Sequence, residues 1–308
     1  MRYHMLSAHI YSHISIVPDF RSSGGMYETL RPELLTATEE QKNEMRTNPT
    51  VVFGRPLFLQ NPLPCLELKR QFILGTMENK WKATIAHRFI ELLHKKTGKF
   101  SRLYTQNIDG LEGQCKDLPS VKVVPVHGTM NRVRCELCLS PMSFRDFCRK
   151  VQANIRDITG QDPDAPTVST PILCLYCGQS TVKPDIILFN APLPKEYFTL
   201  LVQDVPSIDL LFVIGTSLQV YPACEIVRLV PHSTLRVIIN NEPVGQHLGV
   251  AYGEEALRDY HAEGICEDVI LNLIDELGWI SDLNAYIDHL PQQSSTMVKE
   301  RLSRIINM

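Results

Sequence analysis

Two cysteine pairs are the clearest chemical signal in this chain. Cys135 and Cys138 are separated by two residues, and so are Cys174 and Cys177. A tight turn that presents two thiolates is half of a tetrahedral zinc site, and two such turns complete it. Because four cysteines fill the coordination sphere, the predicted zinc is structural, and the 35 intervening residues must loop out. Two unrelated pairs of buried thiols, or a redox dithiol, are the alternatives.

Polar residues follow three predicted buried strands, at the point where each strand ends. The three loops, each after its strand, are Gln106–Asp109 after 102–105, Gly215–Ser217 after Leu210–Ile214, and Asn240–Glu242 after Leu235–Ile239. The carboxyl ends of parallel strands meet at one edge of a sheet, where such sheets bind ligands. The sequence therefore predicts a binding cleft at this edge.

Residues in and near these loops have both chemical and ordinary interpretations. Gly215-Thr216-Ser217 precedes a helix that Pro222 opens. Its small residues could let the backbone approach a phosphate, and an ordinary turn between strand and helix is the alternative. His127 follows a strand and precedes a glycine, but single histidines are more often structural than catalytic. Asn107 and Asp109 could simply form a turn.

Hydrophobic periodicity predicts the elements that position these loops. Apolar residues at spacings of three and four predict a helix over Lys80–Lys96, closed by Gly98. The other predicted elements are strands at Val121–Val126 and Ile186–Phe189 and helices at Lys195–Val202, Pro222–Leu229, Cys266–Leu277 and Ser294–Met308. Strands that are apolar on both faces and alternate with helices predict an α/β fold with a doubly wound parallel sheet.

Two regions depart from this alternation. Phe53–Pro64 is rich in proline, glycine and large apolar residues, and we expect an ordered loop there. Residues 130–183 carry the cysteine pairs, show weak strand signals and have a proline-rich centre, which predicts a small inserted zinc-binding module. The predicted large domain has two parts, 1–129 and 184–280. The inserted module is 130–183, and a helical tail follows at 281–308.

Composition narrows the class of protein. The 308 residues are 44% apolar and 21% charged, which is ordinary for a globular chain. A net charge of −3 provides no positive field for nucleic acid or anionic membrane, so we expect neither as a partner. The longest apolar run, Leu210–Ile214, is far shorter than the roughly 20 residues that span a bilayer. Nine cysteines without a secretory signal favour an intracellular protein, cytoplasmic or nuclear.

Together these motifs resemble the sirtuins, the NAD-dependent protein-lysine deacylases. The resemblance runs from about Val17 to Trp279 and keeps the family order. The matching motifs are Pro18-Asp19-Phe20-Arg21, Thr105-Gln106-Asn107-Ile108-Asp109-Gly110-Leu111-Glu112, His127-Gly128-Thr129, the two cysteine pairs, Gly215-Thr216-Ser217-Leu218, Asn240 and Leu277-Gly278-Trp279. The run of Thr-Gln-Asn-Ile-Asp followed by His-Gly and four cysteines is highly specific.

The resemblance implies a Rossmann-like domain, a smaller zinc domain, and a cleft that takes NAD and an acyl-lysine peptide. It implies that the acyl oxygen attacks C1′ of the nicotinamide ribose, nicotinamide leaves and an imidate forms. The products are nicotinamide, O-acyl-ADP-ribose and free lysine. The implied substrates are acyl-lysine proteins, with histones among the candidates. A catalytically impaired protein-binding module is the rival hypothesis.

The resemblance also assigns residues by their match to the family motifs. His127 matches the general base, with Asn107 and Asp109 orienting the ribose and gripping the nicotinamide amide. Implied NAD contacts are Asp19, Phe20, Arg21, Gln106, Asn107, Ile108, Asp109, Gly215, Thr216, Ser217, Asn240, Asn241, Glu242 and Cys266. The peptide is expected to add as a strand near Ile187–Phe189 and Leu218–Tyr221, against Ile187, Phe189, Leu218 and Val220.

Two departures from the family pattern have consequences. Sirtuins carry Gly-Ala-Gly-x-Ser-x-x-x-Gly-Ile before Pro-Asp-Phe-Arg, where this chain has Ala8-His9-Ile10-Tyr11-Ser12 and then Ile16-Val17. All three glycines are replaced, and of these positions only Ser12 matches. A β-carbon at each former glycine hinders close approach of the pyrophosphate, so we expect weakened NAD binding and little activity. We also expect the first strand to be absent, since only seven residues lie upstream, and the start of the chain to lie elsewhere. Asn190-Ala191 replaces the family's usual Gly-Glu, which leaves the acyl preference open.

Overall fold

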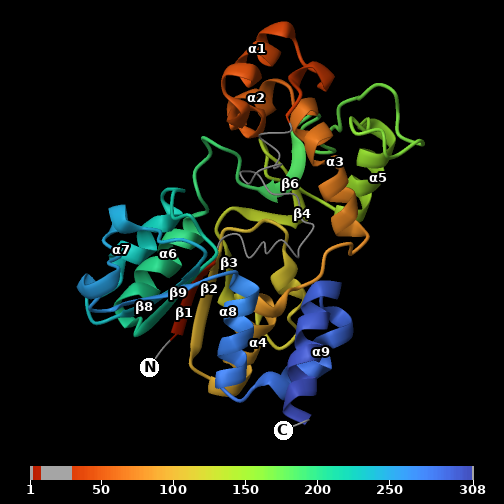
Figure 1. The fold of residues 1–308 in the computed structure, drawn as a ribbon. Coiled ribbons are helices and arrows are strands. Elements are labelled where there is room, and N and C mark those ends of the chain that lie inside the picture. The colour runs from red at the N-terminus through yellow and green to blue at the C-terminus, as the bar shows by residue number, and fades with distance from the viewer. Residues whose placement is uncertain (1–2, 8–29, 307–308) are drawn as a thin grey trace. The chain divides into compact units, whose positions relative to one another are not determined.

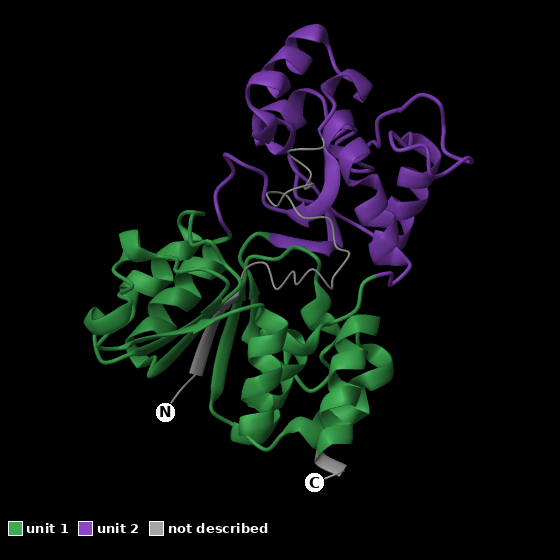
Figure 2. Ribbon diagram, in the orientation of Figure 1, with its two compact units in different colours: residues 1–16, 81–127, 194–308 green, residues 17–80, 128–193 purple. Residues whose placement is uncertain are grey.

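The computed structural model describes residues 3–7 and 30–306, and the chain divides into two compact units (Figure 2). Of the described residues, unit 1 contains 3–7, 81–127 and 194–306, and unit 2 contains 30–80 and 128–193. The predicted module 130–183 is therefore accompanied in unit 2 by a second segment, 30–80. Within the described ranges, no helix combines the length and the apolar character needed to cross a membrane.

Unit 1 is built on a parallel sheet of six strands, as the α/β pattern predicted (Figure 1). The strand order is β3-β2-β1-β7-β8-β9. The strands that follow β1 in the chain lie first on one side of it, as β2 and β3, and then on its other side, as β7, β8 and β9. The strands are β1 Tyr3–Ser7, β2 Phe100–Thr105, β3 Val123–Pro125, β7 Leu210–Ile214, β8 Leu235–Asn240 and β9 Asp259–Glu263. This is a doubly wound Rossmann-like arrangement, whose ligands bind where the order reverses.

The expectation that the first strand is absent is wrong. β1 lies in the middle of the sheet and pairs in parallel with β2 on one side and β7 on the other. The five residues Tyr-His-Met-Leu-Ser carry no apolar run from which a central strand could be recognised. Backbone hydrogen bonding to two neighbouring strands makes them one. The segment Ala8–Ser12, in place of the glycine-rich loop, lies outside the described residues.

Helices of unit 1 follow the predicted positions closely. They are α4 Ile85–Thr97, α6 Lys195–Asp204, α7 Ile226–Leu229, α8 Cys266–Glu276 and α9 Gln292–Ile306. α4 and α8 contribute buried residues to one core with strands β2, β7 and β8, including Phe89, Phe212 and Ile274. The helix predicted from Lys80 begins at Ile85, because Thr84 adopts an extended conformation and its side chain caps the first turn. Gly98 ends it in the left-handed conformation, as predicted.

Unit 2 combines helices with a small antiparallel sheet of order β5-β4-β6. Its elements are α1 Glu39–Thr47, α2 Arg55–Gln60, α3 Leu63–Met77, β4 Gly128–Cys135, β5 Pro141–Met142, α5 Phe144–Asn154 and β6 Val182–Ile186. The expected loop at 53–64 is wrong, because it contains α2 and the start of α3. Pro56 and Pro64 lie in the first turns of these helices, where proline is well tolerated.

The weak strand signals of 130–183 belong to well-formed strands. β4 runs from Gly128 to Cys135 and pairs with both β5 and β6. The strand predicted at Ile186–Phe189 lies earlier, at Val182–Ile186, with Phe189 in an isolated bridge to Gly54. Charged residues such as Arg134 and Lys183 hide these strands from a hydrophobicity pattern, although Lys183 is buried and held by an ion pair to Glu136.

Candidate functional site

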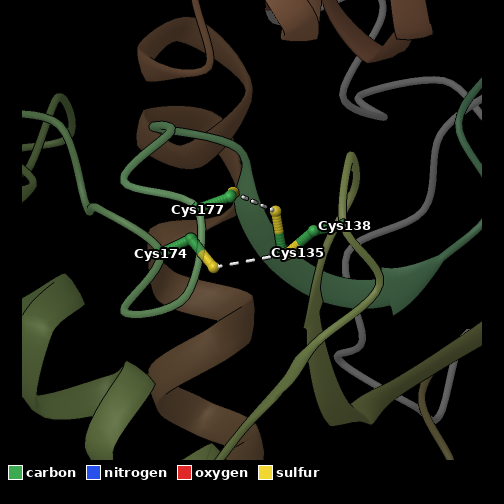
Figure 3. Close-up of side chains that lie close together, drawn as sticks. All are labelled: Cys135, Cys138, Cys174 and Cys177. Atoms are coloured by element: carbon green, nitrogen blue, oxygen red, sulfur yellow. Dashed lines mark hydrogen bonds between the residues drawn. The ribbon is translucent and has the colours of Figure 1, made fainter.

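The four cysteines of unit 2 come together in one cluster, as their spacing predicted (Figure 3). All four sulfur atoms lie within 4.8 Å of one another. The Sγ–Sγ distances are 3.7 Å for Cys135–Cys177 and 3.6 Å for Cys138–Cys174. A tetrahedral zinc with bonds of about 2.3 Å places its sulfurs roughly 3.8 Å apart. The cluster therefore fits a structural zinc site.

Backbone geometry at both turns favours thiolates at this cluster. The N–H groups of Leu137 and Cys138 hydrogen-bond the Cys135 sulfur. Those of Tyr176 and Cys177 do the same for Cys174. Both turns are closed in the same way, because Leu139 N–H donates to Cys135 and Gly178 N–H to Cys174 at their carbonyls. None of the four cysteines is joined to another by a disulfide. Such N–H donors orient metal-bound thiolates.

In unit 1, the predicted polar loops all follow strands of one parallel sheet. β2 leads into Gln106–Asp109, β7 into Gly215–Ser217 and β8 into Asn241, while His127 follows β3. Because the strands are parallel, their carboxyl ends share one edge, as predicted. The edge also contains the reversal of strand order between β1 and β7, where a doubly wound sheet binds a nucleotide.

His127 is half-buried and held by its neighbour loop. Its Nδ1 lies 3.2 Å from the carbonyl oxygen of Gln106. A carbonyl oxygen only accepts, so Nδ1 carries the hydrogen, and Nε2 is the basic nitrogen of the neutral ring. The loop that holds the ring is itself anchored, because Val126 N–H donates to Thr105 O at 2.8 Å. An imidazole that is held through one nitrogen and basic at the other can act as a general base.

Asn107 and Asp109 are buried at the end of β2, only 4% and 2% exposed. The N–H of Asn107 donates to the Thr105 hydroxyl at 3.2 Å, and the N–H of Leu111 donates to Asp109 Oδ1 at 2.9 Å. The Asp109 side chain thus forms a turn, which was one of the alternatives from the sequence, but the residue is buried. Beside it, the buried amide nitrogen of Gln106 has no hydrogen-bond partner among the described residues. An unsatisfied buried donor at this edge fits a polar ligand.

The loops after β7 and β8 converge on the first turn of α8. The N–H of Gly215 and the thiol of Cys266 both donate to the carbonyl oxygen of Ile239, at 2.9 and 3.6 Å. The Asn240 side chain donates to Glu242 O at 3.1 Å, and its own carbonyl accepts from Gly264 N–H. Burial raises the pKa of Cys266 to about 11, which favours the protonated thiol over the thiolate.

Comparison with known proteins agrees with this geometry. The model of the Sir2 family matches residues 11–222. The chain is also 32% identical, over 273 residues, to the NAD-dependent protein deacetylase hst2 of Schizosaccharomyces pombe, covering 88% of this chain and 70% of the relative. The chain belongs to the Sir2 family. Of the residues assigned by resemblance, Asp19, Phe20 and Arg21 lie outside the described part of this Sir2-family chain.

Two further relatives are longer than this Sir2-family chain. Sirtuin-2 of Danio rerio, named as an NAD-dependent protein deacetylase, is 31% identical over 88% of this chain and 66% of its own length. The NAD-dependent deacetylase sir2D of Dictyostelium discoideum is 32% identical over 85% of this chain but 42% of its own length. The chain thus matches between about two fifths and two thirds of these two relatives.

The residues expected to pair with a peptide lie in both units. Ile187 and Phe189 follow β6 in unit 2, and half-buried Val220 and buried Leu218 follow β7 in unit 1. Phe189 already uses both backbone groups, since its N–H donates to Phe53 O and its carbonyl accepts from Arg55 N–H. An added strand would have to use other groups of this segment. Asn190, in place of the family glycine, has a φ of 65°, a left-handed conformation that asparagine tolerates.

Two residues beside Asp109 in this Sir2-family site, His87 and Glu112, had no predicted role. One imidazole nitrogen of His87 and one carboxylate oxygen each of Asp109 and Glu112 lie within 4.8 Å of one another, and all three residues are buried. Glu112 follows Asp109 by three residues across a short helical turn, Leu111–Gln114, which was a usable signal. His87 comes from the first turn of α4, and no sequence signal connects it to this loop.

Proposed function

We propose that this Sir2-family chain removes acetyl or other acyl groups from protein lysines in an NAD-dependent reaction. The products would be free lysine, nicotinamide and O-acyl-ADP-ribose. The observation that carries the proposal is the His127 ring, fixed through Nδ1 by Gln106 at the sheet edge that also holds Asn107 and Asp109. The printed names of the relatives, NAD-dependent deacetylases, support the same reaction.

In this proposal the residues of unit 1 divide the work. When bound, NAD supplies the electrophilic ribose carbon and the nicotinamide leaving group. His127 takes a proton from a ribose hydroxyl through Nε2, while the Nδ1–H bond to Gln106 keeps the ring in the required tautomer. Asn107 and Asp109 hold the nicotinamide end, and Gly215–Ser217 with Asn240–Glu242 and Cys266 hold the remainder of the dinucleotide. The four-cysteine zinc stabilises unit 2 and takes no part in the chemistry.

The rival hypothesis, a protein-binding module without catalysis, is not favoured. A binding module has no need for a histidine whose tautomer is fixed next to a buried asparagine and aspartate. The proposed substrates are acyl-lysine proteins. Histones are included because a relative from Eremothecium gossypii is named an NAD-dependent histone deacetylase. A nuclear or cytoplasmic location is proposed with them.

The direct test is turnover of an acetyl-lysine peptide with and without NAD, read as nicotinamide release. His127→Ala should lower the rate at least about 100-fold while NAD binding persists, because the base acts in the chemical step. His232→Ala, at an exposed histidine of the same unit, is the matched control and should keep wild-type turnover. Equal loss of NAD binding in His127→Ala would make the histidine structural.

The same assay tests the sequence in place of the glycine-rich loop. Ala8→Gly combined with Ile10→Gly should lower KM for NAD at least about tenfold, since a few charge-assisted hydrogen bonds to the pyrophosphate become possible. His9→Gly is the control, because the family carries alanine rather than glycine at that position. An equal gain from His9→Gly would mean that loop flexibility, and not the removal of the two β-carbons, changes the affinity.

A further inference from the structure

The cluster of His87, Asp109 and Glu112 brings two buried acidic side chains close together, and the proposed reaction gives this pairing no role. Asp109 and Glu112 are 2% and 7% exposed, and their nearest carboxylate oxygens lie within 4.8 Å. Two carboxylates this close and this buried cannot both ionise cheaply, because each lacks water and repels the other. One proton in the pair removes most of this cost.

The surrounding groups supply little positive charge to the pair. The guanidinium of Arg88 donates to Glu91 at 2.8 Å and to Gln114 O at 3.0 Å, so its charge is already compensated. The imidazole of His87 stays neutral, since burial and the charge of Arg88 lower its pKa to about 3. Two other titratable groups are neutral or acidic: the Cys115 thiol, and Glu267 of α8, whose carboxylate accepts the N–H groups of Ile85 and Ala86 at the first turn of α4. The proton therefore has to remain on the carboxyl pair.

Glu112 is the member of the pair that retains this proton. Burial and the negative charge of Asp109 raise the pKa of Glu112 to about 8. The Glu112 carboxyl accepts hydrogen bonds from its own N–H and from the Thr105 hydroxyl, which lower its pKa, but burial and the charge of Asp109 outweigh them. As an acid, the Glu112 carboxyl has a hydroxyl that can donate to its neighbour, which a carboxylate cannot do.

Glu112 also connects to the second residue of the loop. Its carboxyl interacts with the Thr105 hydroxyl, and that hydroxyl accepts the N–H of Asn107 at 3.2 Å. One side chain thus faces both Asp109 and the hydroxyl that holds Asn107. The imidazole of His87 lies beside the same pair. Its Nδ1 accepts the N–H of Thr84, so the hydrogen is on Nε2. That Nε2 is a buried donor without a partner among the described residues.

We propose that Glu112, in its protonated form, is a positioning residue that holds Asn107 and Asp109 in the geometry that binds the nicotinamide end of NAD. The inference rests on the proposed function. Above pH 8 the Glu112 carboxyl ionises, and the pair then carries two buried charges whose repulsion displaces Asp109 and the loop that holds it. NAD affinity should then fall, while a bound substrate reacts at a similar rate.

The test compares Glu112→Gln and Glu112→Ala with the wild type between pH 6.5 and 9.5. Glutamine keeps the size and the donor of the protonated acid but cannot ionise. In the wild type, KM for NAD should rise about tenfold above pH 8, with kcat changed less. Glu112→Gln should have the wild-type KM at pH 7 and no rise above pH 8, and Glu112→Ala should have the high KM at every pH. Glu78→Gln, at an exposed position, should reproduce the wild-type profile.

Two outcomes would overturn the inference. In one, Glu112→Gln is as impaired as Glu112→Ala at pH 7, which would mean that the site needs a carboxylate there. In the other, Glu112→Gln removes no protonated-carboxyl band from the infrared spectrum that the wild type shows at pH 7. The band requires no turnover. If the wild type binds NAD but releases no nicotinamide from any acyl peptide, the proposed function fails, and the NAD dissociation constants of the variants still decide the inference.

Discussion

The two buried clusters of this protein differ in what neutralises them. In unit 2, four cysteines face one another from two short turns, with backbone N–H groups directed at the sulfurs. In unit 1, His87, Asp109 and Glu112 meet inside the Rossmann-like domain. The first cluster has the distances of a tetrahedral metal site. The second cluster keeps one proton on its carboxyl pair, because its imidazole is neutral and burial favours one uncharged carboxyl.

The backbone around each cluster sets the acidity of its side chains and the ligand it can hold, as much as the side chains themselves do. The cysteine turns bring N–H donors that stabilise negative charge. The carboxylate pair also has backbone donors, from Leu111 to Asp109 and from Glu112 to its own carboxyl, but burial and mutual repulsion outweigh them at Glu112. The same physical rule therefore predicts a metal-dependent fold for unit 2 and a pH-dependent site in unit 1.

The largest expected effect comes from removing a zinc ligand. Cys135→Ala or Cys177→Ala should lose the metal and most soluble protein, because metal binding is coupled to folding of the unit that provides the ligands. Cys148→Ala, at a buried cysteine of α5 outside the cluster, should keep about one zinc per chain and lose only a little stability. The measurement is zinc content by mass spectrometry alongside soluble yield. Metal-free wild type with full secondary structure would refute the zinc assignment.

The second prediction concerns the glycine that follows the proposed base. Gly128 has a φ of 80°, and a β-carbon there would lie 2.0 Å from the carbonyl oxygen of Asp185. Gly128→Ala should therefore cost more than about 3 kcal/mol of unfolding free energy. Gly98→Ala is a matched control, since Gly98 has a φ of 62° with nothing near its β-carbon, and should cost about 1 kcal/mol. Equal losses in chemical denaturation would mean that backbone strain alone matters.

The third and smallest effect is on the pH dependence of stability. Glu112 has its pKa raised from 4.5 to about 8 in the folded protein. Between these values the folded state keeps a proton that the unfolded state has released, so stability falls as pH rises from about 4.5 and levels off above 8. Glu112→Gln should therefore lose less stability than the wild type between pH 5 and 8. Urea unfolding at several pH values measures this, and parallel curves would contradict it.

Several elements could be predicted because their signal is local. The β7 strand at Leu210–Ile214 is a continuous apolar run, and α4 shows helical periodicity with a glycine stop. The cysteine spacing alone predicted the cluster. By contrast, β1 and β4 were missed, since both are strands by virtue of pairing with neighbours from distant parts of the chain. The helices α2 and α3 were hidden by prolines that lie at their first turns.

The sequence by itself determined the parallel α/β fold, the four-cysteine site and the loop residues at the strand ends, because periodicity, spacing and the alternation of elements along the chain need no long-range information. Tertiary structure alone decided which nitrogen of His127 is basic, since the Gln106 carbonyl selects the tautomer. It alone placed His87 of α4 beside Glu112. The physical reason is that acidity and tautomer depend on burial and on neighbours within a few ångströms, and folding brings those neighbours from segments far apart in the chain.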